Sequence, residues 1–221
     1  MITYEQKLDR DTRWAFLEGS MHFERESAVH KTLEKIARRL EEHGIPYAIA
    51  GAMAMFFHGY RRFTDDVDIL VTAEGLQRIH EALEGLGYLP PFEGSKNLRD
   101  AETGVRIEFL VTGQYPGDGK PKPIAFPNPE GTAVAIAGMR ILSLEKLIEL
   151  KLASGTAPGR LKDLGDVQEM IKEFQLPAEF ASKLDPSVRE LYSALRSDLS
   201  LTTDAEKPKK GFVTPSNELN G

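Results

Sequence analysis

Two aspartates, Asp66 and Asp68, stand one residue apart at the start of the apolar run DVDILV. Successive side chains of a strand point to opposite faces, so both carboxylates project from one face while Val67 and Ile69 point into the core. At a rise of about 3.3 Å per residue they lie roughly 7 Å apart along the backbone and can converge on one hard cation. Mg²⁺ is usually held by one or two carboxylates together with substrate phosphates. The pair therefore predicts a metal site that acts on a phosphorylated substrate.

The elements before this pair are expected to position it. Residues 25–43 carry apolar side chains at three- and four-residue spacing, which predicts an amphipathic helix, and Gly44 supplies its C-cap. A short strand at residues 47–50 ends at Gly51, and an apolar helical segment follows. The helix after Gly51 would offer backbone N–H groups and a positive dipole end to an anion.

A third acid occurs in the next apolar segment. Residues 96–100 and 105–111 predict a hairpin around a turn at residues 102–104. In the second strand Arg106, Glu108 and Leu110 share one face, so Glu108 is an acid in an otherwise hydrophobic strand. Residues 113–130 are rich in proline and glycine, which predicts a loop or lid.

The C-terminal half reads as one strand followed by helices. Residues 132–137 predict a strand, residues 139–141 are expected to lead into a helix capped by Ser143, and residues 162–174 and 186–199 predict two more helices. Lys151 lies on the apolar stripe of the first helix, where a lysine either extends to the rim or meets an anion. Between residues 73 and 86 another amphipathic helix is expected.

Composition is that of an ordinary soluble protein, with 41% hydrophobic and 28% charged residues among 221. The net charge of −6 argues against broad attraction to nucleic acid, although local basic pairs such as Arg160 and Lys162 are present. With no cysteine, no secretory segment and no apolar run of membrane-spanning length, we expect a cytoplasmic protein without a membrane partner. We divide the chain into a helical lead-in (1–24), a core (25–142), a helical region (143–200) and a disordered tail (201–221).

The order of these elements and acids resembles the nucleotidyltransferase fold of the polymerase-beta type over about residues 25–196, and within it the small bacterial AbiE-type toxin-like nucleotidyltransferases. The matching segments are Arg62-Phe63-Thr64-Asp65-Asp66-Val67-Asp68, Glu108 in RIEFLV, Lys151 in LEKLIELKLAS, and Arg160-Leu161-Lys162-Asp163-Leu164-Gly165-Asp166. The resemblance implies an α+β fold, in which a small mixed sheet is flanked by helices and followed by a C-terminal helical extension. Two positions depart from the family pattern: Ala52 follows the turn glycine, and Glu108 stands where aspartate is usual.

The resemblance also implies roles for individual residues. Asp66, Asp68 and Glu108 would be catalytic and would hold two Mg²⁺ ions. Nucleotide binding would fall to Gly51, Ala52, Arg62, Thr64 and Lys151. Behind these, Asp163 would orient Lys151, with support from Lys162 and Asp166. The ions would stabilise the leaving pyrophosphate and activate an acceptor hydroxyl.

The activity so implied is transfer of a nucleoside monophosphate from a nucleoside triphosphate (NTP) to an acceptor hydroxyl. The acceptor would be an RNA or tRNA end, in a toxin-like role with an antitoxin-like protein partner, or a small molecule such as an aminoglycoside. A non-catalytic nucleotide- or partner-binding module that retains the fold is the alternative. A purely structural role for the acids and for Lys151 is a third interpretation.

Overall fold

The computed structural model describes residues 2–205, in which seven strands form one mixed sheet. Their order across the sheet is β3-β4-β5-β2-β1-β7-β6. The strands are β1 (Tyr47–Ile49), β2 (Asp66–Val71), β3 (Tyr88–Leu89), β4 (Leu98–Asp100), β5 (Arg106–Val111), β6 (Ala133–Ile136) and β7 (Met139–Leu142).

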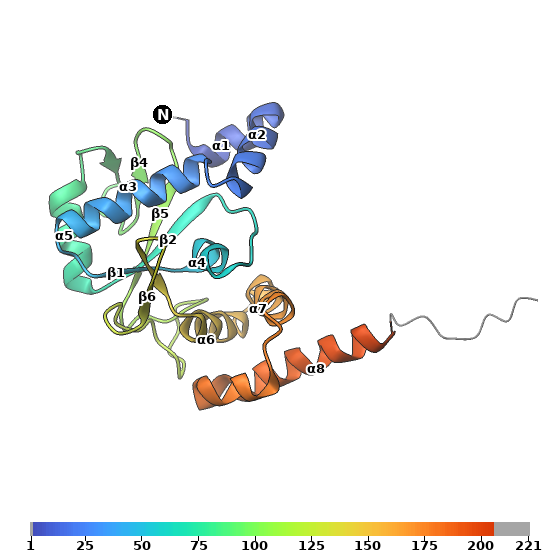
Figure 1. Ribbon diagram of the computed structural model, residues 1–221. Coiled ribbons are helices and arrows are strands. Elements are labelled where there is room, and N and C mark those ends of the chain that lie inside the picture. The colour runs from blue at the N-terminus through green and yellow to red at the C-terminus, as the bar shows by residue number, and fades with distance from the viewer. Residues whose placement is uncertain (1, 206–221) are drawn as a thin grey trace, which may run out of the picture.

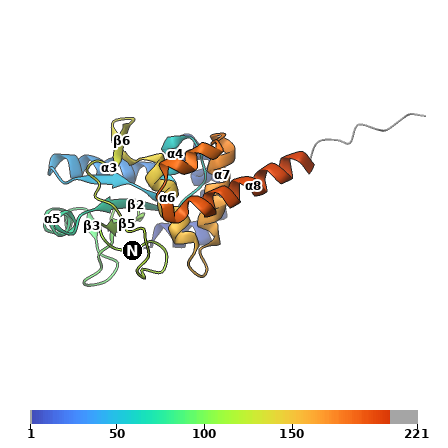
Figure 2. The ribbon, with the colours of Figure 1, turned by 90° about the horizontal axis from the view of Figure 1, so that it is seen from below.

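Helices flank this sheet and extend the chain beyond it. They are α1 (Tyr4–Arg10), α2 (Thr12–Phe23), α3 (Ala28–Glu42), α4 (Gly51–His58), α5 (Ala73–Leu83), α6 (Leu144–Gly155), α7 (Leu161–Glu173) and α8 (Arg189–Ala205), with 3₁₀ turns at Ala178–Lys183 and Pro186–Val188. Helices α1 and α2 lie at one end of the molecule and α6, α7 and α8 at the other (Figure 1). From below, α8 projects away from the rest of the molecule (Figure 2). The expected fold class, a mixed sheet flanked by helices with a C-terminal helical extension, is confirmed.

The central strands are fully packed, and their register places the acids. Strand β2 pairs antiparallel with β1 and parallel with β5. Val67, Ile69, Ile107 and Phe109 are completely buried, as the alternation of side chains predicts. In the parallel pair Asp68 lies opposite Glu108, and Asp66 lies opposite Arg106. The register therefore gathers four charged residues on the other face of two adjacent strands.

Residues 139–141 do lead into a helix capped by Ser143, as expected, but sequence analysis did not predict that they form a strand. They form strand β7, which pairs antiparallel with β6 and parallel with β1 through Ile49 and Ile141. The turn joining β6 and β7 consists of Ala137 and Gly138, both with positive φ (50° and 79°). Two such residues make a tight hairpin turn, so the chain returns along β6 before Ser143 caps α6.

Other boundaries differ by a few residues. Helix α5 ends at Leu83 rather than at residue 86, because Gly85 and Gly87 adopt positive φ (79° and 94°) in the turn that leads to the short strand β3. The last helix begins after a 3₁₀ turn and runs to Ala205, so residues 201–205 of the expected disordered tail are helical. Residues 206–221 of that tail lie outside the described residues.

Candidate functional site

The three predicted acids come together. Each of Asp66, Asp68 and Glu108 offers a carboxylate oxygen, and these oxygens all lie within 4.8 Å of one another. We call these three residues the carboxylate cluster. It follows from two facts of the sequence, the D-x-D spacing on β2 and an acid on the same face of β5, together with the register that sets Asp68 beside Glu108. Such a group can hold a divalent metal ion.

Sequence reasoning missed a fourth member of this face, Arg106. Its Nη2 lies 3.3 Å from Asp66 Oδ2 and 3.1 Å from Glu108 Oε1. The signal was available, because Arg106 precedes Glu108 by two residues and shares its face of β5. One guanidinium therefore faces three carboxylates.

The positive charge of Arg106 does not fully offset the negative charge of the cluster, as the pKa of Asp68 shows. Burial, together with the charges of Asp66 and Glu108, raises the pKa of Asp68 to about 7. A bound cation would favour the charged carboxylate and reverse that shift. Three hard oxygen donors with surplus negative charge fit Mg²⁺ or Mn²⁺, whereas a softer metal would need nitrogen or sulfur ligands.

The N-terminus of α4 borders the cluster. Gly51 has a φ of 57°, and a Cβ added there would lie 1.8 Å from Asp68 Oδ2. Glycine is thus required both by the backbone and by the closeness of the carboxylate. Among the described residues no side chain caps this helix, which leaves its first N–H groups without a side-chain acceptor beside Gly51 and Ala52.

Thr64 and Arg62 hold the loop before β2. The Thr64 hydroxyl donates to Asp66 Oδ1 at 2.7 Å and so orients that carboxylate. Arg62 binds Asp166, which is not part of the carboxylate cluster, with Nε at 3.0 Å and Nη2 at 3.1 Å. The structure therefore places Thr64 against the cluster and Arg62 in a structural ion pair.

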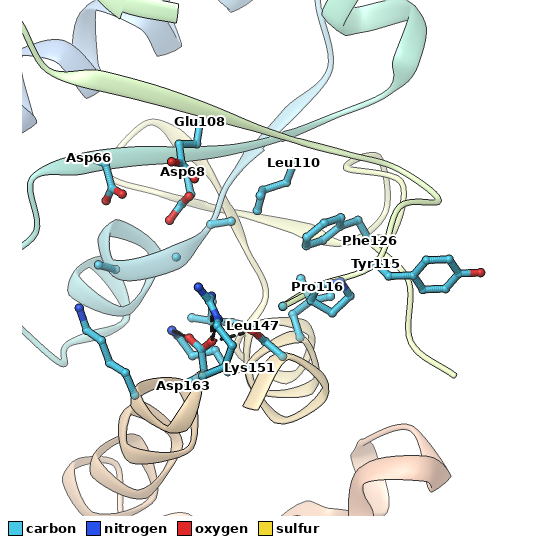
Figure 3. A pocket seen from close by; sticks show the side chains of 18 of the residues that line it. Asp66, Asp68, Glu108, Leu110, Tyr115, Pro116, Phe126, Leu147, Lys151 and Asp163 are labelled. Atoms are coloured by element: carbon cyan, nitrogen blue, oxygen red, sulfur yellow. Dashed lines mark hydrogen bonds and ion pairs between the residues drawn. The ribbon is translucent and has the colours of Figure 1, made fainter. Parts of the chain in front are cut away.

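A cavity of about 810 Å³ opens in front of the cluster. Asp66, Asp68 and Glu108 enter it from the sheet, and Lys151 and Asp163 lie opposite them on the helical side (Figure 3). Gly51, Ala52, Arg62, Thr64 and Lys162 also line it, whereas Asp166 does not. Apolar side chains line another part, namely Leu110, Pro116, Phe126, Leu147 and Leu150. The volume admits a nucleotide with room for part of a second molecule.

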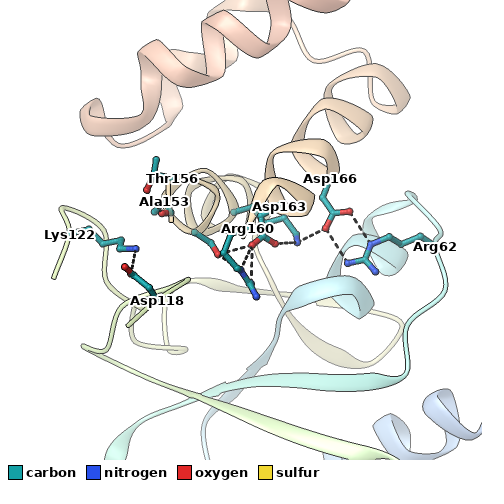
Figure 4. Close-up of polar contacts among 10 residues, drawn as sticks. Arg62, Asp118, Lys122, Ala153, Thr156, Arg160, Asp163 and Asp166 are labelled. Carbon is teal, nitrogen blue, oxygen red and sulfur yellow. Dashed lines mark hydrogen bonds and ion pairs between the residues drawn. The ribbon is translucent and has the colours of Figure 1, made fainter. Parts of the chain in front are cut away.

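The helical wall of the cavity is an alternating row of charges (Figure 4). Lys151 donates to Asp163 Oδ1 at 3.1 Å and to Asp166 Oδ2 at 2.7 Å. Asp166 also binds Arg62, and Asp163 also binds Arg160 at 2.9 Å. We call Arg62, Asp166, Lys151, Asp163 and Arg160 the charge ladder.

Most of the ladder is buried and internally satisfied. Lys151, Asp163 and Asp166 are each less than a tenth exposed. Burial opposes ionisation of Asp163, but Lys151, the Ser154 hydroxyl and Arg160 hold its pKa below the ordinary value. Lys151 already has two anionic partners, so positive charge left for a ligand lies on exposed Lys96 and Lys162 and on Arg160, which is half-exposed and pairs with Asp163.

The predicted loop at residues 113–130 forms the remaining wall. Gly113, Gln114, Tyr115 and Pro116 line the cavity at its start, and Phe126 does so near its end. The loop is closed at its base by two backbone hydrogen bonds, from Gly113 N–H to Phe126 O (2.9 Å) and from Phe126 N–H to Gln114 O (2.8 Å). It is therefore an ordered wall of the cavity.

Comparisons with known proteins give structural neighbours. No family model matches the sequence, and no curated protein does. The solved structures that resemble the fold include ANT(2″)-Ia in complex with adenylyl-2″-tobramycin (18% identity, 76% of this chain and 97% of that one, TM-score 0.44). JHP933 from Helicobacter pylori is similar to a comparable degree (16% identity, 80% of this chain and 95% of that one, TM-score 0.44). So is an antigenic nucleotidyltransferase-like protein from Paracoccidioides brasiliensis (20% identity, 79% of this chain and 91% of that one, TM-score 0.45). None of the three assigns an activity to this chain.

Within residues 2–205, no helix combines the length and the apolar character that crossing a membrane requires.

Proposed function

We propose that this protein is a Mg²⁺-dependent nucleotidyltransferase that moves a nucleoside monophosphate from an NTP to an acceptor hydroxyl. The observation that carries the proposal is the carboxylate cluster, whose oxygens lie within 4.8 Å of one another at the edge of the cavity. Two further features support it: an uncapped helix N-terminus beside Asp68 and exposed basic side chains on the facing wall. Together they supply what a metal–triphosphate complex needs.

Asp66, Asp68 and Glu108 would hold the metal, for which we propose two Mg²⁺ ions. When bound, such ions polarise phosphoryl oxygens and stabilise the charge of a leaving pyrophosphate. Thr64 fixes the rotamer of Asp66 through its hydrogen bond. Gly51 and Ala52 bind phosphate oxygens through backbone N–H groups, so the alanine at position 52 removes a side-chain hydroxyl and leaves these donors in place.

The helical wall supports the same proposal. Arg160 and Lys162 attract the triphosphate, while Lys151 contributes positive potential from within the charge ladder. Asp163 and Asp166 hold Lys151 in place, and Arg62 ties the loop before β2 to α7 through Asp166. Arg62 thus supports nucleotide binding by positioning its neighbours.

Two classes of acceptor are considered for this reaction. An RNA end, with a toxin-like role and an antitoxin-like partner as in AbiE-type proteins, and a small molecule such as an aminoglycoside are both compatible with the chemistry. The apolar part of the cavity, lined by Leu110, Phe126 and Leu147, favours a compact acceptor over a charged polymer.

The test uses the full chain with each α-³²P-labelled NTP, Mg²⁺, and either total RNA or a panel of aminoglycosides. We expect label to appear in one acceptor class and to require Mg²⁺. Mg²⁺-dependent NTP binding without transfer to any acceptor would favour the non-catalytic binding module. If nucleotide binding is insensitive to Mg²⁺ and unchanged in Asp66→Ala and Asp68→Ala, the site is wrongly assigned.

A further inference from the structure

Arg106 is, among the described residues, the base that pairs directly with the carboxylate cluster. Through the single atom Nη2 it reaches Asp66 at 3.3 Å and Glu108 at 3.1 Å. These are two of the three residues assigned to the metal. A divalent ion held by the same carboxylates would therefore bring its charge close to the positive charge of Arg106.

The guanidinium of Arg106 also faces an acid outside the cluster. Arg106 Nε is buried and lacks a hydrogen-bond partner, and Glu5 Oε1 of α1 lies 3.9 Å from it. That separation is within ion-pairing range but longer than a hydrogen bond. A small shift of Arg106 toward α1 would satisfy Nε and release the two carboxylates.

Glu5 is held in place by the fold. Arg99 of β4 donates a hydrogen bond to each of its carboxylate oxygens, at 2.8 and 3.2 Å. Helix α1 itself is anchored by Tyr4, whose N–H donates to Gly104 O at 3.2 Å and whose hydroxyl donates to Glu18 at 3.0 Å. Tyr4 is only 1% exposed. Glu5 is thus a fixed charge beside Arg106.

We propose that Arg106 is an internal counter-ion that competes with the metal for Asp66 and Glu108, and that Glu5 is the positioning residue that receives Arg106 when the metal binds. The inference rests on the metal site of the proposed function and adds a partner from outside the cavity. Like charges repel at these distances, so the guanidinium and the ion cannot both keep full contact with the same oxygens. The N-terminal helix thereby sets the metal affinity of a site to which it contributes no ligand.

The first experiment measures Mn²⁺ affinity by isothermal titration calorimetry, without nucleotide, on the full chain. Removing the competing cation in Arg106→Gln should tighten binding about tenfold, from the Coulomb term of one nearby charge in a high-dielectric site. Arg106→Lys should stay close to the wild type. Lys96→Gln is the control, because Lys96 lines the cavity in front of the cluster and no ion pair is described for its side chain. Equal tightening in Lys96→Gln would overturn the proposal, because net charge alone would then explain the effect.

The second experiment is a double-mutant cycle with Glu5→Gln. If Glu5 receives Arg106, Glu5→Gln weakens Mn²⁺ binding about threefold to tenfold in the wild-type background and has little effect when Arg106 is already glutamine. Additive effects in the two backgrounds would show that Glu5 acts only through its distant charge and would refute the positioning role. Thermal unfolding of every variant identifies any that fail to fold. If Arg106→Gln does, Arg106→Met, which also removes the charge, replaces it in both experiments.

Failure of the proposed function gives a different result. A wild-type protein that binds no Mn²⁺ under these conditions contradicts the metal site itself, and the role of Arg106 falls with it. Wild-type Mn²⁺ binding that is unchanged in Arg106→Gln contradicts the role of Arg106 alone and leaves the metal site intact.

Discussion

The carboxylate cluster and the charge ladder face each other across one cavity, and they treat charge in opposite ways. In the ladder, acids and bases alternate, and each buried group has an opposite charge as its neighbour. In the cluster, three carboxylates face the single guanidinium of Arg106. Accordingly the pKa of Asp163 is lowered while that of Asp68 is raised.

The contrast separates positioning from binding. A buried charge that has its partners holds structure together, because removing one member leaves the others uncompensated. A carboxylate group with surplus charge is costly for the protein alone and becomes favourable when a cation arrives. The ladder is therefore the scaffold of the cavity, and the cluster is the part that a cation would bind. Mutations on the two walls should have different signatures.

The largest effect is expected on activity from the cluster. Asp66→Ala or Asp68→Ala should lower nucleotidyl transfer about a thousandfold or more, since each removes a metal ligand. The measurement is label transfer from α-³²P-NTP at saturating Mg²⁺, with circular dichroism to confirm folding. Activity within tenfold of the wild type would remove these residues from the reaction.

The ladder should instead govern stability. Lys151→Met keeps the side-chain volume but leaves Asp163 and Asp166 buried without their shared cation, which should cost about 3–5 kcal/mol in urea denaturation. Arg38→Met is the matched control, because it breaks an exposed pair with Glu42 at 3.9 Å and should cost less than about 0.5 kcal/mol. A Lys151→Met variant as stable as Arg38→Met would erase the distinction between the two walls.

On the wall of the cluster, the opposite sign is expected. Asp68→Asn should stabilise the metal-free protein in the same urea denaturation, since it relieves repulsion within the cluster.

Gly51 tests how tightly the cluster is built. Gly51→Ala combines a positive φ with a Cβ that would meet Asp68, and we expect a loss of about 1–3 kcal/mol in stability. Metal affinity should fall as well, because Asp68 must move. Gly44→Ala is the control: Gly44 has the same φ of 57° but open space around its Cβ position. If both variants bind Mn²⁺ equally well, the contact between Gly51 and Asp68 is unimportant for the site.

The smallest predicted effect concerns pH. The pKa of Asp68 is raised above the ordinary carboxyl value to about 7, so the folded, metal-free protein holds a proton that the unfolded chain releases near pH 4. Stability from this group is thus present below about pH 4 and is lost as pH rises toward 7. Metal binding must displace that proton, so Mn²⁺ affinity should fall about tenfold per pH unit below 7. The same titration on Asp68→Asn should be flatter, and equal slopes would assign the proton to another group.

Much of the site was predictable because it depends on local periodicity. The two-residue repeat of a strand put Asp66 with Asp68, and put Glu108 on the face of its own strand that points away from the core. The apolar stripe of α6 placed Lys151 where it either extends to the rim or meets an anion, and it meets the anions Asp163 and Asp166. These statements require only that the segments form a strand or a helix.

What could not be predicted depends on pairings between distant segments. The position of Asp68 opposite Glu108 follows from the strand order, to which the neighbouring residues contribute no signal. Strand β7 escaped prediction because a short apolar segment before a helix cap is compatible with either structure. Both partners of Lys151, Asp163 and Asp166, lie on another helix, so these contacts form only when α6 and α7 pack together. The family resemblance named both residues, but the apolar pattern of α6 contains no signal for them.

The loop between β5 and β6 has a consequence for how this cavity could change. Its base is closed by backbone hydrogen bonds between Gly113 or Gln114 and Phe126, and the residue that this closure restricts is Gly113, whose φ of 83° favours glycine. Ile124 of this loop is part of the core and Gly117 packs against Ser154, but the exposed residues between them can be lengthened, shortened or replaced while the strand register that assembles the carboxylates stays as it is. Variation in this one segment would change the wall of the cavity that lies beside the carboxylate cluster.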